Sequence, residues 1–141
     1  MSANVLVVDD SGTMRGMIKR TLAISGLDIG EVFEASNGIE ALARMDEHPV
    51  SVILLDINMP LMNGIQLLSR MHDDQRLRGI PVIIASTAGS EPQIHELLAA
   101  GARGYVRKPF RPEQLRDMLL PIIGSRSPAA QPVPGDPDLS F

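Results

Sequence analysis

Hydrophobic residues along this 141-residue chain form two kinds of segment that alternate with each other. Three short, uninterrupted apolar runs occur at residues 5–8, 52–55 and 81–85. Their β-branched residues and sharp polar boundaries predict strands that are buried on both faces of a sheet. Two weaker runs, residues 31–35 and 104–107, also fit strands.

A helical pattern follows each predicted strand. Apolar residues at helical spacing occur in segments 14–22, 39–45, 65–71, 94–98 and 115–122. Ser36 or Asn37 is suited to an N-cap, and Pro92 to a first helical turn. Pro121 is expected to kink or end the last helix, because proline lacks the backbone N–H and clashes one turn back. A strand and a helix repeated five times predict an α/β fold, with a parallel sheet covered by helices on both faces.

The composition changes after Gly124. Residues 125–141 contain four prolines and show no apolar periodicity. We therefore expect one domain over residues 1–124, followed by a disordered tail or the stub of a linker over residues 125–141.

Composition and charge narrow the classes of function. The net charge of −4 argues against a nucleic-acid-binding surface as the main activity. The absence of cysteine excludes a thiolate metal site and a cysteine nucleophile. No signal peptide is recognisable, and no apolar run approaches the ~20 residues that a membrane-spanning helix needs. A cytoplasmic protein without a membrane partner is the expectation.

Polar side chains stand where the predicted strands end. Asp9 and Asp10 follow the first strand, Asp56 the third, Ser86 the fourth and Lys108 the fifth. In a parallel α/β sheet, ligands bind just outside the carboxyl ends of the strands, so these side chains are expected to converge.

The converging side chains suit phosphoryl chemistry. Clustered carboxylates repel one another, and a hard cation such as Mg²⁺ relieves that repulsion through oxygen ligands. A hydroxyl and an ammonium group would bind phosphoryl oxygens. Asp56, alone at the end of the most apolar strand, is the best candidate for a nucleophile that forms an aspartyl-phosphate, which leaves Asp9 and Asp10 for the metal.

Four segments carry a family resemblance: VVDDSGTMRGMIKRTL, LLDINMPLMNGIQLL, PVIIAST and GARGYVRKPF. Together they resemble the receiver domain of bacterial two-component response regulators, and the stand-alone chemotaxis type most closely. The resemblance covers roughly residues 3–123. It implies a flavodoxin-like, doubly wound (βα)5 fold with strand order 2-1-3-4-5. It also implies a signalling domain that is not an enzyme, beyond catalysing its own phosphorylation and dephosphorylation.

The same resemblance implies roles for individual residues. Asp56 is similar to the phosphoacceptor. Asp10, Asp56 and the backbone carbonyl of Asn58 resemble direct Mg²⁺ ligands, and Asp9 resembles an acid that binds the metal through water. Lys108 resembles the cation that contacts the phosphoryl group, next to an expected cis bond to Pro109.

The resemblance further implies a switch and two partners. Ser86 is similar to the hydroxyl that moves toward the phosphoryl group, and Tyr105 to the ring that follows it. The next residue, Thr87, could replace Ser86, because that assignment rests on spacing alone. The phosphodonor would be a sensor histidine kinase, and a downstream protein, such as the flagellar motor switch in chemotaxis-type members, would bind the fourth helix and fifth strand. Candidate contact residues there are Glu91, His95, Tyr105 and Arg107.

Three other functions fit parts of the pattern. A haloacid dehalogenase-type phosphatase also uses a strand-end aspartate, but its second acid would stand where this chain has Ser11. A receiver fold that serves as an unphosphorylated scaffold is a second possibility, although such proteins usually lose an acid or the lysine. The chain could also be a receiver fragment of a larger regulator.

Overall fold

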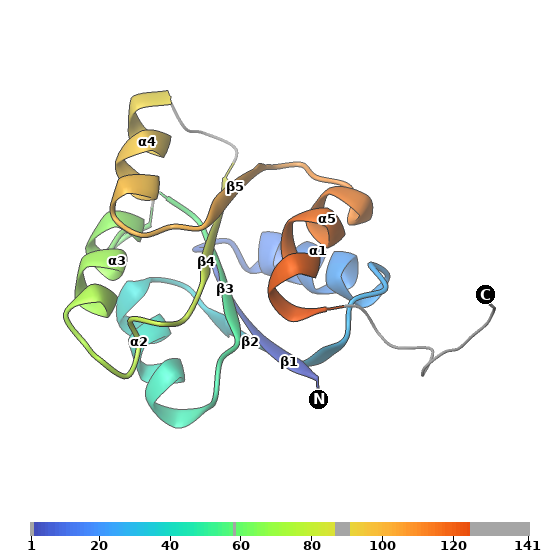
Figure 1. Ribbon diagram of the computed structural model, residues 1–141, viewed down its shortest axis with the longest axis horizontal. Coiled ribbons are helices and arrows are strands. Elements are labelled where there is room, and N and C mark those ends of the chain that lie inside the picture. Colours follow the sequence, from blue (N-terminus) through green and yellow to red (C-terminus); the bar gives the residue numbers. More distant parts are fainter. Residues whose placement is uncertain (1, 58, 87–90, 125–141) are drawn as a thin grey trace.

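The computed structural model describes residues 2–57, 59–86 and 91–124, which form five strands and five helices in strict alternation (Figure 1). The strands are β1 (Ala3–Val8), β2 (Ile29–Ala35), β3 (Val52–Leu55), β4 (Val82–Ser86) and β5 (Gly104–Arg107). The helices are α1 (Gly12–Ala23), α2 (Gly38–Glu47), α3 (Gly64–His72), α4 (Glu91–Ala99) and α5 (Pro112–Ile123).

The strands form one parallel sheet in the order β2-β1-β3-β4-β5. Helices α1 and α5 cover one face, and α2, α3 and α4 cover the other (Figure 1). The predicted doubly wound α/β fold and its strand order are therefore confirmed.

Alternation along the central strands divides the core into two layers. Leu6 and Ile53 point toward the α2–α3–α4 face, whereas Val7 and Leu54 point toward α1 and α5. All four side chains are essentially inaccessible to solvent. Burial on both faces explains why these strands read as continuous apolar runs.

Side-chain caps set where most helices begin. The Ser11 hydroxyl accepts a hydrogen bond from the Met14 amide, and the Asn37 side chain accepts one from the Glu40 amide. Asn37, rather than Ser36, is thus the N-cap of α2. Asn63 caps α3 in a reciprocal pair with Gln66, in which each side chain accepts from the other residue's backbone N–H. These caps pair amides that would otherwise have no partner in the first turn.

The ends of some elements differ from the sequence expectation. β1 and β2 begin two residues earlier than predicted, and β4 runs through Ser86. Helix α5 continues past Pro121 and ends at Ile123. His48, just after α2, is half-buried, and its ring stacks on that of Phe33 with the ring centroids 4.2 Å apart.

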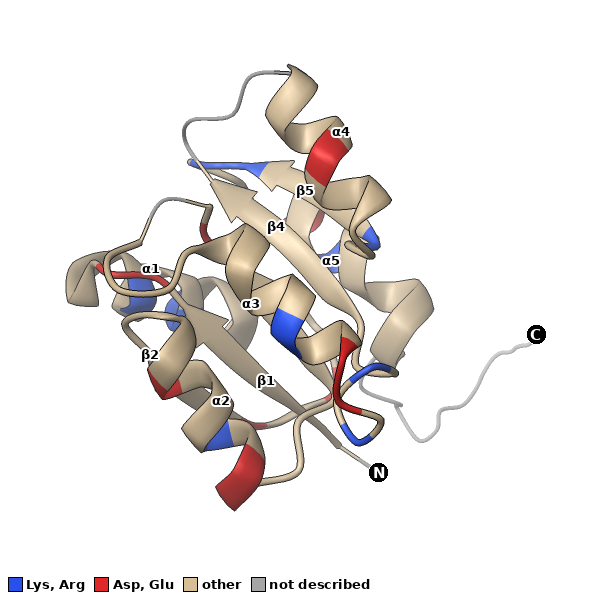
Figure 2. Ribbon diagram, turned by 90° about the vertical axis from the view of Figure 1, so that its left-hand side faces the viewer, with Lys and Arg blue, Asp and Glu red and all other residues tan. Residues whose placement is uncertain are grey.

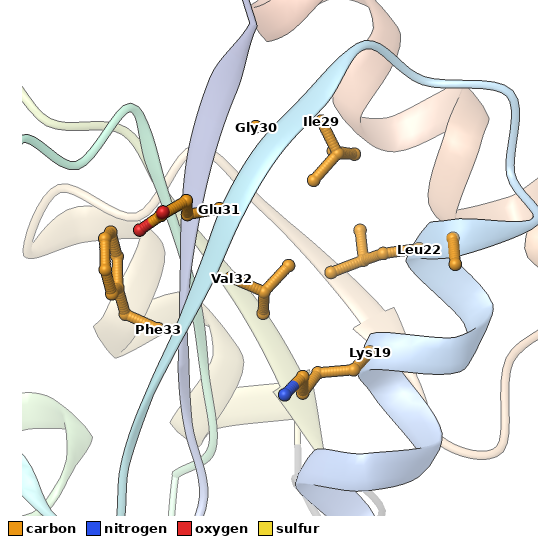
Figure 3. A pocket seen from close by; sticks show the side chains of 8 residues that line it. Lys19, Leu22, Ile29, Gly30, Glu31, Val32 and Phe33 are labelled. Atoms are coloured by element: carbon orange, nitrogen blue, oxygen red, sulfur yellow. The ribbon is translucent and has the colours of Figure 1, made fainter.

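A shallow groove of about 530 Å³ lies between α1 and the edge strand β2 (Figure 3). Leu22, Ile29 and Val32 form its apolar wall, and Lys19 lies along it. None of the strand-end aspartates lines this groove, so the groove is a separate feature from the polar cluster described below.

Charged residues of both signs are interspersed on α2 and around the end of α3 (Figure 2). The Arg76 guanidinium, for example, pairs with Asp46 at 3.1 Å and with Asp74 at 3.1 Å. Within the described part of the chain, no helix is long and apolar enough to cross a membrane.

Candidate functional site

Asp9, Asp10 and Asp56 lie together because β1 and β3 are neighbouring strands. Val8 stands opposite Leu55, so the residues that follow them emerge side by side at the carboxyl edge of the sheet. The Asp56 amide donates to the Val8 carbonyl at 2.9 Å. One carboxylate oxygen from each aspartate lies within 4.8 Å of the other two. The structure thus brings together three side chains that the sequence predicted to converge.

The three carboxylates differ in exposure. Asp9 is buried, Asp56 is half-buried and Asp10 is exposed. The Asp9 carboxylate accepts a hydrogen bond from the Ser11 amide at 2.9 Å. One oxygen of Asp56 accepts from the Ile57 amide, also at 2.9 Å. Backbone hydrogen bonds therefore hold Asp9 and Asp56 in place, while Asp10 faces solvent.

Lys108 reaches this cluster from the end of β5, an edge strand two positions from β3 in the sheet. Its amide donates to the Ser86 carbonyl at 3.0 Å, which holds the end of β5 against β4. Its Nζ forms an ion pair with the Asp9 carboxylate and lies 3.9 Å from an oxygen of Asp56. The side chain is only 4% exposed. The predicted cis bond between Lys108 and Pro109 is present.

The environment of Asp56 changes its acidity. Burial raises the pKa of this carboxyl above its ordinary value, and the nearby Asp9 carboxylate adds to that effect. The Lys108 ammonium, the Ser86 hydroxyl and the Ile57 amide oppose it, because each stabilises the charged form. The net result is a raised pKa, so the Asp56 carboxylate is under-compensated by the protein alone.

Ser86 links the acidic cluster to Tyr105. The Ser86 side chain is buried at the end of β4, and its hydroxyl hydrogen-bonds Asp56. Its carbonyl accepts from the Tyr105 hydroxyl at 3.5 Å. The Tyr105 ring is half-buried and packs against the core layer under α4. The two residues predicted to switch together are therefore in direct contact.

Comparison with known proteins identifies the family of this chain. Residues 5–120 match the response regulator receiver domain family. The chain belongs to this family. It is 39% identical over 122 residues to the chemotaxis protein CheY1 of Helicobacter pylori, covering 86% of this chain and 97% of that protein. It is 38% identical over 124 residues to the CheY homolog of Campylobacter jejuni, covering 87% and 94%.

Solved structures of receiver proteins agree with the fold. The chemotaxis protein CheY4 of Vibrio cholerae is 35% identical and superposes with a TM-score of 0.77, over 87% of this chain and all of that one. A putative response regulator of Chloroflexus aurantiacus is 26% identical with a TM-score of 0.78, over 86% and 98%. The flavodoxin-like assignment and the role in two-component signalling are thereby confirmed. Receiver domains of this kind are signalling proteins.

Two predicted site residues lie outside the part of the receiver domain that the structure describes. They are Asn58, expected to offer a backbone carbonyl to the metal, and Thr87, the alternative to Ser86. The predicted tail, residues 125–141, also lies outside it. These assignments stay predictions.

Arg15 of α1 belongs to the surroundings of the site and was missed by the sequence reasoning. Its guanidinium donates to the backbone carbonyl of Asp9 at 2.6 Å and to the Glu34 carboxylate at 2.9 Å. Its spacing from Ile18 and Leu22, the buried residues of α1, could have indicated its role. Residues three or four positions apart share one face of a helix, so Arg15 lies on the face that packs against the sheet.

The cluster of Asp9, Asp10 and Asp56 fits a divalent cation. Three carboxylates offer only oxygen ligands, as hard cations such as Mg²⁺ and Ca²⁺ prefer. Asp9 is already paired with Lys108, whereas Asp10 faces solvent and Asp56 has only a 3.9 Å approach to that ammonium. Asp10 and Asp56 therefore have the most room for direct ligation, with Asp9 behind them.

Proposed function

We propose that this chain is a phosphoacceptor receiver domain that takes a phosphoryl group on Asp56 in a Mg²⁺-dependent reaction. The phosphodonor is a phosphohistidine of a sensor histidine kinase. The observation that carries the proposal is the arrangement around Asp56, where two further carboxylates, a hydroxyl and a buried ammonium converge on one carboxylate. A carboxylate that only capped the helix or turn after a strand would not need this combination of groups around it.

The contacts of Asp56 suit it to act as the nucleophile. Its carboxylate oxygen attacks phosphorus, the P–N bond of the phosphohistidine breaks, and the imidazole leaves with the bonding electron pair and takes up a proton. The Ile57 amide holds one oxygen of Asp56 and thereby orients the carboxylate. Lys108, 3.9 Å away, is placed to neutralise charge on the phosphoryl oxygens.

A divalent cation held by Asp10 and Asp56, with Asp9 nearby, would neutralise charge on the transferred group and the acceptor. The raised pKa of Asp56 supports this, because burial without enough positive charge disfavours the carboxylate that the reaction requires. A cation in the cluster would keep that carboxylate ionised at neutral pH.

Ser86 and Tyr105 are the proposed switch. A phosphoryl group on Asp56 adds negative charge and acceptor oxygens within reach of the Ser86 hydroxyl. If Ser86 turns toward them, the hydrogen bond between its carbonyl and the Tyr105 hydroxyl is disturbed. The ring is then free to change position in the α4–β5 surface, and phosphorylation biases a two-state equilibrium.

The downstream partner would bind the surface formed by α4 and β5. His95 of α4 and Arg107 of β5 are exposed, while the side chain of Glu91, also expected on this surface, lies outside the described part. Because several relatives are chemotaxis proteins, we propose a role in chemotaxis, with the flagellar motor switch as the partner class and the cytoplasm as the compartment.

Intact-mass spectrometry with acetyl phosphate tests the acceptor. We expect one phosphoryl increment in Mg²⁺, none in EDTA, and none for Asp56→Asn. Asp46→Asn, which removes an exposed carboxylate outside the cluster, is the matched control and should be labelled like wild type. A folded protein that takes up no phosphoryl group would instead be an unphosphorylated scaffold. Labelling that survives Asp56→Asn would reject Asp56 as the acceptor.

A further inference from the structure

We propose that Arg15 is a positioning residue, which orients the Asp9–Asp10 corner so that Asp10 presents its carboxylate to the divalent cation. The inference rests on the proposed function, since it concerns the same cation. Arg15 is not itself a ligand, because a guanidinium has no electron pair to give a metal. It acts through the main chain of Asp9.

The contacts of Arg15 make a bridge between α1, the end of β1 and the edge strand β2. Its Nη1 donates to the Asp9 carbonyl at 2.6 Å, and its Nε donates to the Glu34 carboxylate at 2.9 Å. The Arg15 side chain is 19% exposed, so both hydrogen bonds lie partly out of water. A guanidinium suits this bridge because its donors form a rigid planar fork.

The hydrogen bond to Asp9 fixes the direction in which Asp10 leaves the sheet. The Asp9 amide still pairs with β2, donating to the Ala35 carbonyl at 3.0 Å, but the Asp9 carbonyl is taken by Arg15 instead. That carbonyl belongs to the peptide unit whose nitrogen and next Cα are those of Asp10. Because the peptide unit is planar, holding its oxygen also sets where the Asp10 Cα lies.

Electrostatics alone would give Arg15 the opposite effect. A guanidinium near a cation site repels the cation, so its presence would weaken binding. Here the Glu34 carboxylate offsets part of the charge, and its own pKa is lowered chiefly by the hydrogen bond from Arg15. Lys19, which lies along the groove shown in Figure 3, holds the second oxygen of Glu34 at 3.2 Å. This cluster of two cations and one anion keeps Arg15 in place.

Isothermal titration of the metal-free protein with Mg²⁺ separates positioning from charge. Arg15→Lys keeps the positive charge but loses the rigid planar fork, so its ammonium cannot hold both acceptors in the same geometry. Arg15→Gln removes the charge as well. If Arg15 acts by position, both variants bind Mg²⁺ about 10-fold more weakly, the size typical when a residue that orients a ligand is lost. Arg20→Gln removes the same charge from an exposed position of the same helix and should bind like wild type.

A role through charge alone predicts the opposite pattern. Arg15→Lys would then match wild type, and Arg15→Gln would bind Mg²⁺ more tightly, with a difference that shrinks as salt is added. Either result overturns the proposal. If Arg15→Gln fails to fold in a thermal melt, Arg15→Lys still decides between position and charge.

Amide hydrogen exchange in the absence of Mg²⁺ gives a readout independent of binding. We expect faster exchange in Arg15→Lys than in wild type at Ser11, whose amide donates to the Asp9 carboxylate, with β3 unchanged. Unchanged exchange at the Ser11 amide would overturn the positioning role. If wild type itself does not bind Mg²⁺, the proposed function fails. If wild type binds and Arg15→Lys binds equally well, only the inference about Arg15 fails.

Discussion

Leu61, in the segment between β3 and α3, has the only positive φ among the described residues other than glycine, at 66°. Its side chain is 78% exposed, so it gains little from burial. A left-handed conformation costs an ordinary residue roughly 1–2 kcal/mol, whereas asparagine adopts it readily. We expect Leu61→Asn to raise the free energy of unfolding by about 1 kcal/mol, measured by urea denaturation.

Leu61→Ala is the control for that substitution. Alanine removes the same exposed apolar atoms but keeps the Cβ that makes a left-handed conformation unfavourable. We expect it to give no comparable gain. Equal stabilisation by alanine and asparagine would mean that removal of the exposed side chain, and not relief of the backbone, is responsible.

At the scale of residues, the sequence predicted which polar side chains lie together where a rule of topology applied. Asp9, Asp10, Asp56, Ser86 and Lys108 each follow a strand, and the carboxyl ends of parallel strands share one edge. The geometry of parallel strands was thus enough to predict that these five side chains lie at one edge of the sheet. Arg15 could not be found this way, because its partners depend on how far a long side chain reaches from a helix to a carbonyl in another element. No local pattern encodes that distance.

At the scale of elements, two helical glycines should respond to alanine in opposite ways. Gly16 in α1 has open space where a Cβ would lie, with only the end of the Arg20 side chain at 3.8 Å. Gly16→Ala should therefore stabilise by about 0.5–1 kcal/mol, the usual advantage of alanine over glycine in a helix. Thermal or urea unfolding measures this gain.

Gly38, the first residue of α2, is in the opposite situation. An added Cβ would lie 2.5 Å from Cγ and 2.8 Å from Cβ of Met62, in the segment that precedes α3. The Gly38 amide also donates to the Met62 carbonyl at 3.0 Å, so the two backbones are tied together. Gly38→Ala should destabilise by about 1–3 kcal/mol, because the contact forces one of them to move. A stabilising effect would show that Met62 moves aside freely.

The boundaries of elements were predicted less well than their existence, for local reasons. At the start of β2 the register with β1 shifts, and the Asn4 side chain accepts from the Glu31 amide where a backbone carbonyl would normally do so. A side chain that replaces a ladder hydrogen bond cannot be recognised from apolar pattern. In α5, Pro121 removes one hydrogen bond near the exposed end of the helix, where water is available to the freed carbonyl, so the helix runs two residues further.

At the scale of the whole molecule, the site exists only because of strand order. Lys108 and Asp9 are 99 residues apart in the sequence and meet through the packing of four strands. The sequence identified both residues and the edge where they would meet, but not which carboxylate the lysine would hold. In the structure its ion pair is with Asp9, and Asp56 remains the less compensated acid.

Because Asp56 is under-compensated, its charge should lower the stability of the metal-free protein. The pKa of Asp56 is raised in the folded state above its ordinary value of 3.8, so between 3.8 and the raised value the folded protein binds more protons than the unfolded chain. Stability contributed by this group therefore falls as pH rises through that window. In EDTA at pH 7, we expect Asp56→Asn to unfold at a higher urea concentration than wild type.

The dependence on pH distinguishes this effect from a change in packing. Asparagine retains an oxygen for the Ile57 amide but has no charge, so its advantage over wild type should disappear as the pH falls below 3.8, where the aspartate is neutral in both states. Asp46→Asn, which removes an exposed carboxylate, should change stability little at either pH. Added Mg²⁺ should reduce the advantage of Asp56→Asn, because a ligand that binds only the folded wild type stabilises it increasingly as the ligand concentration exceeds the dissociation constant. If Asp56→Asn is instead less stable than wild type in EDTA at pH 7, the attraction of Lys108 at 3.9 Å outweighs the cost of burial.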